Sequence, residues 1–239
     1  MDKNLFIEML IKKAREISIN IDESEANNFF EYMEELIRWN EKVNLTAITK
    51  PEEIITKHFI DSLTIEKYIP KNASIIDVGT GAGFPGIPIK ILKPETKITL
   101  LDSLNKRIIF LEKIIAKLRL TNIFAVHGRA EELGREEEHR ETFDIATSRA
   151  VAGLNGLLEY MAPFVKVNGK IICMKGPKIE EELKESKKAI QELGLEIEKI
   201  EKISFLNEEM ERNILILNKK NETPQKYPRR GVNIRKSPL

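Results

Sequence analysis

Alternating glycines follow a short apolar run, and an acidic residue stands near the end of that run. Residues 75–86 read IIDVGTGAGFPG, in which the acid is Asp77 and glycine occupies every second position from Gly79 to Gly83. Such an apolar run is typical of a buried parallel strand, and glycine lets a backbone approach a ligand closely because it has no side chain. Pro85 suits the first turn of a following helix. The segment therefore predicts a strand, a turn and a helix start that together cradle a nucleotide.

Two classes of cofactor fit this cradle. The dinucleotide fingerprint G-x-G-x-x-G can be read as Gly81, Gly83 and Gly86, which leaves NAD open. In that fingerprint, however, the first glycine directly follows the strand, and here Gly79 has that position. The order apolar–apolar–Asp–apolar–Gly-x-Gly-x-Gly resembles the first motif of S-adenosylmethionine-dependent methyltransferases. We therefore expect S-adenosylmethionine, and a tight turn without any ligand is the simplest alternative.

Acidic residues also follow the next two predicted strands. Asp102 ends the strand predicted over 97–102, where an acid can accept the ribose hydroxyls of an adenosine. Its alternative role is to cap the next helix at the surface. Glu131, or the backbone amide of Ala130, follows the third predicted strand and is placed to meet the adenine edge. A glutamate at a helix start is common, so the second signal is weak by itself.

Two cations end the strands that follow. Arg149 and Lys175 stand at the ends of neighbouring predicted strands, and we expect them to face one pocket. Two cations there are costly unless an anion or a paired acid balances them. We expect an RNA phosphate or base edge, which makes the pair candidates for positioning the substrate in catalysis. The alternative is a salt bridge to Asp61 or Glu131.

The elements that must position these residues fall into two parts. The first 70 residues predict helices: one over 5–17, one that begins at Asp22 with a capping box, and one that begins near Pro51. From residue 75 onward strands and helices alternate, which is typical of a parallel sheet covered by helices on both faces. The strands after the first are predicted over 97–102, 123–127, 143–147, 170–175, 195–205 and 212–217, and the helices over 106–118, 154–161 and 179–193.

Composition limits the classes of protein that the chain can represent. Its 239 residues are 41% hydrophobic and 32% charged, as in an ordinary globular protein. No apolar run reaches the ~20 residues that a membrane span needs, and the polar start is unlike a secretory signal. Three scattered histidines and the single Cys173 give no metal-ligand spacing and no disulfide, and no nucleophile elbow is present. We expect a cytoplasmic protein without a metal.

Positive charge is concentrated at the C-terminus. The whole chain has a net charge of +1, yet residues 219–239 hold only one acid, Glu222, beside seven basic residues: Lys219, Lys220, Lys226, Arg229, Arg230, Arg235 and Lys236. A basic tail on an acidic body suggests contact with a polyanion such as RNA. A solvated, flexible terminus explains the composition equally well.

Several of these segments together resemble one family. The motifs are Trp39-Asn40-x-x-x-Asn44-Leu45-Thr46-Ala47-Ile48, His58-x-x-Asp61-Ser62-Leu63, the glycine segment, Arg129-Ala130-Glu131, Ser148-Arg149-Ala150, Lys175-Gly176 and Tyr227-Pro228-Arg229-Arg230. They are similar to those of the bacterial glucose-inhibited division protein B family from about Leu36 to Leu239. That resemblance implies an S-adenosylmethionine-dependent methyltransferase that modifies guanine N7 in small-subunit (16S) ribosomal RNA.

The resemblance also implies a fold and site residues. The fold would be the α/β class I methyltransferase fold, a Rossmann-like and mostly parallel seven-stranded sheet. We divide the chain into a helical cap (1–70), a methyltransferase domain (71–218) and a basic tail (219–239), and we expect a monomer. The cofactor site would comprise Gly79, Phe84, Asp102, Ser103, Leu104, Ala130, Glu131 and Arg149. We assign RNA binding to Asn44, His58, Asp61, Lys175, Arg229, Arg230 and Arg235.

Guanine N7 keeps its lone pair at neutral pH, so this reaction needs no general base and rests on alignment of the reactants. The target guanine must be unstacked, which single-stranded RNA allows at least cost. The alternatives are a methyltransferase for a small molecule, which would need no basic tail, and a ribosome-assembly factor that binds RNA without catalysis.

Overall fold

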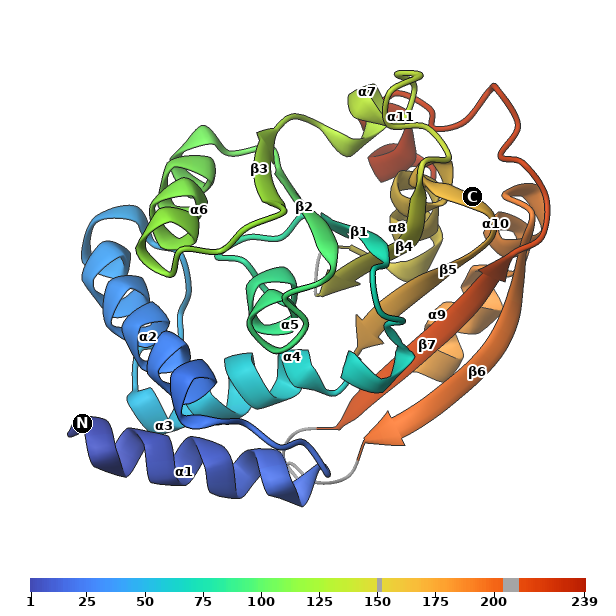
Figure 1. The fold of residues 1–239 in the computed structure, drawn as a ribbon. Helices are drawn as coiled ribbons and strands as arrows, with labels where there is room; N and C mark the ends of the chain where they lie inside the picture. Colours follow the sequence, from blue (N-terminus) through green and yellow to red (C-terminus); the bar gives the residue numbers. More distant parts are fainter. Residues whose placement is uncertain (150–151, 204–210) are drawn as a thin grey trace.

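One seven-stranded sheet organises the chain. The computed structural model describes residues 1–149, 152–203 and 211–239. The strands are β1 (Ser74–Val78), β2 (Lys97–Asp102), β3 (Ile123–His127), β4 (Phe143–Arg149), β5 (Val165–Lys175), β6 (Leu195–Ile203) and β7 (Arg212–Lys219). They lie in the order β3-β2-β1-β4-β5-β7-β6, and β7 alone runs opposite in direction to the other six strands (Figure 1). This arrangement confirms the predicted class I methyltransferase sheet with its closing hairpin.

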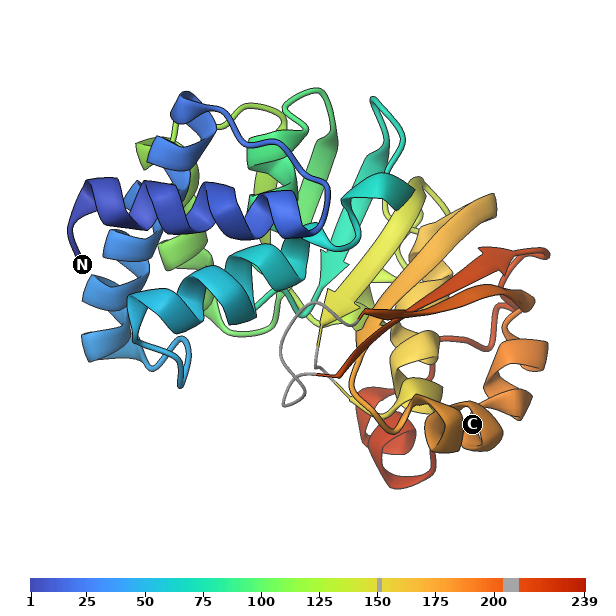
Figure 2. The ribbon, with the colours of Figure 1, turned by 90° about the horizontal axis from the view of Figure 1, so that it is seen from below.

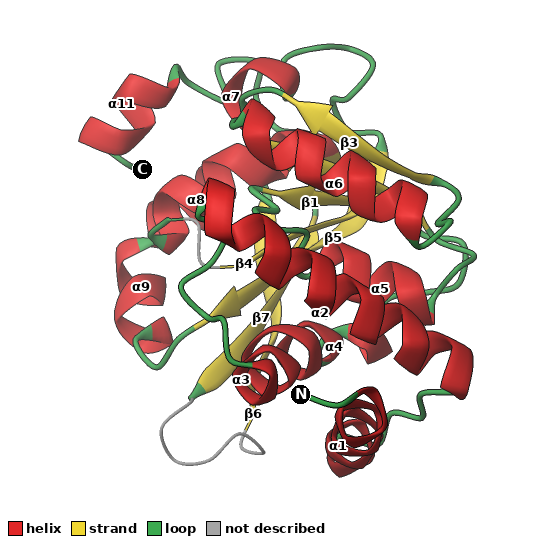
Figure 3. Cartoon of the chain, turned by 90° about the vertical axis from the view of Figure 1, so that its left-hand side faces the viewer, coloured by secondary structure: helices red, strands yellow, loops and turns green. Residues whose placement is uncertain are grey.

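Helices cover both faces of the sheet (Figures 1 and 3). The N-terminal part supplies α1 (Lys3–Glu16), α2 (Glu23–Val43), α3 (Pro51–Ile54), the π-helical segment η1 (Ile55–Ile60), α4 (Asp61–Leu63) and the 3-10 turn η2 (Glu66–Tyr68). The later helices are α5 (Gly86–Leu92), α6 (Asn105–Lys117), α7 (Ala130–Leu133), α8 (Leu154–Met161), the 3-10 turn η3 (Ala162–Phe164), α9 (Ile179–Glu185), α10 (Lys187–Glu192) and α11 (Gly231–Lys236).

The hydrophobic core has one half on each face of the sheet, because successive strand residues point in opposite directions. Ile75 packs toward the N-terminal helices with α5 and α6, whereas Ile76 packs toward α8, α9 and α10. The predicted helical cap therefore shares its core with one face of the sheet. The view from below shows the N-terminal helices on one side of the sheet (Figure 2). The division into cap, domain and tail stays a prediction.

Helix α2 also touches the glycine segment directly. The capping box of Asp22 and Glu25 is present and starts the helix where the sequence predicts it. Ten residues into the helix, the buried Tyr32 donates a hydrogen bond to the carbonyl of Ala82 and stacks on Phe84 with ring centroids 5.4 Å apart. The N-terminal helices therefore help to hold the glycine turn in place.

Several boundaries differ from the predicted ones. Strand β5 begins five residues early, since Val165 already pairs with Phe143. The helix predicted over 179–193 breaks at Ser186, whose hydroxyl donates to the carbonyl of Glu182 at 2.6 Å. Pro85 precedes helix α5 as its N-cap instead of lying in its first turn. The predicted strand end at Phe205 falls outside the described residues.

Candidate functional site

Two adjoining cavities lie at the carboxyl edge of the sheet and share Gly79, Asp102 and Ser103. The larger, about 430 Å³, is lined by Leu45, Thr46, His58, Gly79, Thr80, Gly81, Ala82, Phe84, Asp102, Ser103, Arg107 and Arg149. The smaller, about 260 Å³, is lined by Val78, Gly79, Leu101, Asp102, Ser103, Gly128, Arg129, Ala130, Glu131, Ala152, Tyr160 and Arg235. Ligands of open α/β sheets bind at this edge.

The glycine turn packs against the protein at Gly83 and is open to the larger cavity at Gly81. Gly79, Gly81 and Gly83 all have positive φ, a region that glycine adopts more easily than any residue with a side chain. A Cβ at Gly83 would come within 2.5 Å of Ile87 Cδ1, whereas a Cβ at Gly81 would meet nothing within 4 Å. Gly83 therefore serves packing, and Gly81 leaves an open approach to the backbone for a ligand in the larger cavity.

Asp77, the acid of the first motif, supports this turn from underneath. Its Oδ2 accepts hydrogen bonds from the Thr80 hydroxyl at 2.7 Å and from the Gly86 amide at 2.9 Å. Burial raises the pKa of Asp77 to about 6, even though both of these hydrogen bonds favour the charged form. The carboxyl thus joins the strand end to the start of α5 and lines neither cavity.

Asp102 lines both cavities but already has several partners. Its Oδ1 accepts from the Leu104 amide at 2.9 Å, and its Oδ2 accepts from the Gly81 amide at 2.9 Å and from Arg107 Nη1 at 3.0 Å. A carboxylate offers about four lone-pair positions, so room is left for one hydroxyl donor. Arg107, in the first turn of α6, was not identified from the sequence because a basic residue on an amphipathic helix gives no distinctive pattern.

The smaller cavity is closed by the C-terminal segment. Ala130 and Glu131, which the sequence predicts to meet the adenine edge, begin α7 and line this cavity. Arg235 of α11 and Tyr160 of α8 line it too, and sequence reasoning assigned neither to this place. A Cβ at Gly231 would lie 2.0 Å from Glu131 Oε1, so α11 packs against α7 as closely as its backbone allows.

These features fit an adenosine-containing cofactor. The open backbone at Gly81, the remaining acceptor position of Asp102 and the slot beside Ala130 form a continuous surface across the two cavities. Together they offer one edge for a ribose and one for a planar base. Ser103 lines both cavities, whereas Leu104 donates its amide to Asp102 and lines neither.

Arg149 is bound on several sides. Its guanidinium carbon lies 4.8 Å from the Phe84 ring centroid, its Nη1 lies 3.0 Å from Asp61 Oδ2, and its Nη2 lies 3.1 Å from His58 Nδ1. Asp61 is completely buried and also accepts from Arg212 Nε at 2.7 Å. The salt bridge to Asp61 that the sequence left open is therefore present, and Arg212 is a second partner that the sequence did not identify.

Lys175 points away from this cluster, so the expectation of one shared pocket is wrong. In the strand register Arg149 is paired with Met174, so these two side chains lie on the same face of the sheet. The side chain of Lys175, the next residue, therefore projects from the opposite face. There Lys175 Nζ lies 2.6 Å from Glu182 Oε2 and donates to the Ala152 carbonyl at 2.9 Å. Its anion is a glutamate of α9, not Asp61 or Glu131. Lys175 lines neither cavity.

The cap residues divide in the same manner. His58 and Asp61 lie on the same helical face, and His58 lines the larger cavity. Asn44 is the exposed left-handed C-cap of α2 and lines neither cavity, whereas its neighbours Leu45 and Thr46 line the larger one. Its assignment to RNA binding stays a prediction.

The tail is ordered against the body of the protein. Arg229 forms a double hydrogen bond with the fully buried Glu159, with Nη2 lying 2.6 Å from Oε2, and Lys219 is buried beside Glu141 at 2.8 Å. The interpretation of a flexible terminus is therefore wrong for these two residues, because ion pairs with acids of the body hold their charges. Arg230 is exposed.

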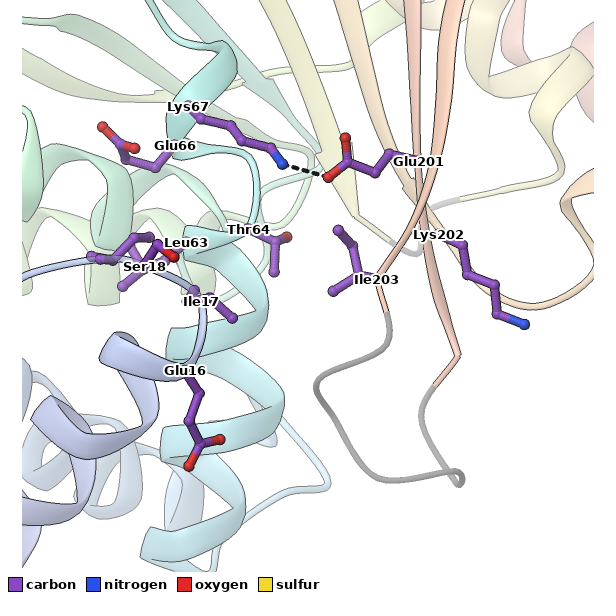
Figure 4. Close-up of a pocket in the computed structure, with 11 residues that line it drawn as sticks. Glu16, Ile17, Ser18, Leu63, Thr64, Glu66, Lys67, Glu201, Lys202 and Ile203 are labelled. Carbon is purple, nitrogen blue, oxygen red and sulfur yellow. Dashed lines mark hydrogen bonds and ion pairs between the residues drawn. The ribbon is translucent and has the colours of Figure 1, made fainter.

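A third cavity, about 360 Å³, lies beside the end of α1, and its lining contains none of the predicted site residues (Figure 4). Lys67 and Glu201 form an ion pair across it and so connect η2 to β6. Within the described residues, no group of three or more His, Cys, Asp or Glu side chains could hold a metal ion. No helix in that part of the chain is long and apolar enough to cross a membrane.

Comparison with known proteins identifies the family. The GidB family, described as rRNA small subunit methyltransferase G, matches residues 25–215. Proteins called ribosomal RNA small subunit methyltransferase G are 48% identical in Thermoanaerobacter sp. (99% of this chain, 100% of the relative) and 47% identical in Clostridium kluyveri (98% and 99%). A SAM-dependent methyltransferase structure from Aquifex aeolicus shares the fold, with a TM-score of 0.56 and 15% identity over 73% of this chain and 97% of that one. The chain belongs to the GidB family of small-subunit rRNA methyltransferases.

Proposed function

We propose that this protein transfers a methyl group from S-adenosylmethionine to N7 of one guanine in small-subunit ribosomal RNA. The observation that carries the proposal is the open glycine turn beside Asp102, in a chain of the GidB family. The relatives that cover this chain almost completely are named as small-subunit rRNA methyltransferases, which supports the same substrate. Guanine N7 as the acceptor atom follows from the motifs shared with the family.

The reaction makes few demands on the protein. When bound, S-adenosylmethionine supplies an activated methyl group on a sulfonium sulfur. Because N7 carries a lone pair at neutral pH, no side chain has to remove a proton. Holding reactants in line can supply ~7–11 kcal/mol of the barrier, and the rigid turn and the stacked Phe84, His58 and Arg149 provide a surface of fixed shape for that purpose.

The assigned roles follow the two cavities. Gly79, Phe84, Asp102, Ser103, Ala130, Glu131 and Arg149 would hold the cofactor, with Leu104 acting through Asp102. RNA would approach from the side of the helical cap, past His58, toward the exposed Arg230 of the tail. We expect the protein to act as a cytoplasmic monomer without a metal, on ribosomal RNA or an assembling small subunit.

Two measurements test the proposal. N7-methylguanosine is mapped in small-subunit RNA from cells with and without the gene, and we expect one methylated guanine to disappear and to return with the wild-type gene. Calorimetry on the purified protein should show binding of S-adenosylmethionine and not of NAD. An unchanged methylation map would overturn the proposal. Cofactor binding without RNA methylation would favour a small-molecule substrate, and RNA binding without cofactor binding would favour an assembly factor.

A further inference from the structure

The lining of the larger cavity next to the helical cap includes a chain of hydrogen-bonded side chains that begins at a buried acid. Asp61 binds Arg149, and Arg149 Nη2 lies 3.1 Å from His58 Nδ1. On the other side of the ring, His58 Nε2 lies 2.8 Å from Thr46 Oγ1. Thr46 itself is partly exposed and lines the cavity.

The direction of every hydrogen bond in this chain is fixed by Arg149. A guanidinium can only donate, so His58 Nδ1 must accept. A neutral imidazole that accepts at Nδ1 carries its hydrogen on Nε2, and that hydrogen is then donated to Thr46 Oγ1. Burial, together with the Arg149 charge, lowers the pKa of His58 to about 3, so the ring is neutral at physiological pH.

Thr46 is thereby left with a single hydrogen-bonding capacity toward the cavity. A hydroxyl has two lone pairs and one hydrogen. One lone pair accepts from His58 Nε2 and the other from the Ile48 amide at 3.0 Å. Within the described part of the chain the Thr46 hydrogen has no protein acceptor, so the hydroxyl can only donate to whatever occupies the cavity.

We propose that the Thr46 hydroxyl donates a hydrogen bond to O6 of the target guanine and so selects guanine over adenine. The inference rests on the proposed function. The edge of guanine that contains N7 presents two acceptors, N7 and O6, whereas adenine presents an amino donor in place of O6. A hydroxyl that can only donate can bind O6 of guanine, but it faces a second donor in the amino group of adenine.

A neutral donor also suits the chemistry better than a cation would. The purine gains positive charge as N7 is methylated, and a guanidinium against O6 would oppose that charge. His58 and Thr46 transmit the direction imposed by Arg149 while its charge stays paired with Asp61. Thr46 is then a specificity residue that touches the base, and His58 is a positioning residue that acts through it.

The test compares purines at the methylated position of a small-subunit RNA ligated from pieces. Guanine has O6, 2-aminopurine lacks it, and 2,6-diaminopurine replaces it with an amino donor. Single-turnover methyl transfer is measured for the wild type, for Thr46→Val and for the exposed Thr49→Val as a matched control. Loss of one hydrogen bond to O6 should slow Thr46→Val on guanine about 10–100-fold.

The expected pattern is specific to contact with O6. Thr46→Val should be slow on guanine yet match the wild type on 2-aminopurine, and Thr49→Val should match the wild type throughout. An equal loss on both purines, or a wild-type rate on guanine, would overturn the inference. Weaker binding of S-adenosylhomocysteine to Thr46→Val in calorimetry would do so as well, since the hydroxyl would then serve the cofactor. If the wild type methylates no guanine, the proposed function fails first.

His58 has a test that a merely structural role would not pass. In His58→Phe the Thr46 oxygen regains a lone pair for the cavity, so the rate ratio of guanine to 2,6-diaminopurine should fall at least about fivefold. In His58→Gln the amide can accept from Arg149 and donate to Thr46, and the ratio should return toward the wild-type value. Equal ratios in all three proteins would mean that His58 does not set the direction of the hydroxyl.

Discussion

Arg149 and Lys175 end neighbouring strands of one sheet, yet they lie in different surroundings. Arg149 faces the helical cap, where a fully buried Asp61, His58 and Phe84 surround its guanidinium. Lys175 faces the opposite side, where Glu182 and one carbonyl hold its ammonium. One residue of offset in the register between β4 and β5 produces this difference. Two like charges at adjacent strand ends therefore do not predict one anion site unless the register is known.

The acids of the two ion pairs also differ in their number of cationic partners and in their exposure to solvent. Asp61 pairs with two arginines at once and has no exposure to solvent, whereas Glu182 is 23% exposed and, among the described residues, pairs with one cation, Lys175. A buried charge that loses its partner is expensive because the interior cannot solvate it. We therefore expect loss of the acid to lower the free energy of unfolding more on the Arg149 side than on the Lys175 side.

The largest expected effect is on stability. Asp61→Asn leaves two arginines without a counter-charge and should lower the free energy of unfolding by about 3–5 kcal/mol. Glu182→Gln should lower it less, by about 1–2 kcal/mol, because it leaves one buried cation instead of two and Lys175 keeps the Ala152 carbonyl as an acceptor. Urea denaturation of both variants measures the difference, with the half-buried Glu53→Gln as a control: it breaks one ion pair within a helix and should cost less than either of them. Equal losses for the first two would contradict the distinction between the two sides.

The second effect is on methyl transfer. Arg149→Met removes a wall of the larger cavity and should reduce single-turnover transfer at least about a hundredfold, which corresponds to ~2.7 kcal/mol. Lys175→Met should leave the rate within about threefold of the wild type, because its ammonium lies on the opposite face of the sheet. Both variants are assayed with saturating cofactor after circular dichroism confirms that they are folded. A large loss for Lys175→Met with unchanged cofactor affinity would restore its predicted role in positioning RNA.

Features that depend on residues close together in the sequence could be predicted. Strands β2 and β3 match their predicted bounds because apolar runs and flanking polar residues mark both ends locally. The capping box at Asp22 was equally visible, since its two partners are three residues apart. Gly79, Asp102 and Ala130 meet at one edge because parallel strands place their ends together.

The partners of charged residues were not predictable in the same way. Asp61 and Arg212 are separated by 151 positions, and Glu159 and Arg229 by 70, so no local pattern connects them. Arg235 lines the smaller cavity only because the tail returns to pack α11 beside α7. Composition shows how much charge a segment carries, but the tertiary packing decides which of those charges are neutralised.

The third effect is the pH dependence on the Arg149 side. Because the folded state holds His58 neutral with a pKa of about 3, the unfolded chain alone binds its proton between about pH 6.5 and 3. Stability is therefore lost as the pH falls through that window, by about 2 kcal/mol between pH 7.5 and 5 from this group. His58→Gln should lack this loss in urea denaturation. Asp77 has a raised pKa and the opposite dependence, but it is common to both proteins and cancels in the comparison. Identical pH profiles would mean that His58 is not buried as a neutral ring.

The smallest effect extends the comparison to the tail, where Arg229 and Arg230 are adjacent. Arg229 is bound by the buried Glu159, whereas Arg230 is exposed, so only Arg230 is available to a phosphate. Arg230→Ala should reduce the slope of log affinity for single-stranded RNA against log salt by about 0.7, the value for one phosphate contact. Arg229→Ala removes the same charge, should leave that slope unchanged, and should lower the thermal midpoint because Glu159 loses its partner. If both variants lose the same slope, Arg229 leaves Glu159 when RNA binds, and the distinction between paired and available charge does not hold in the complex.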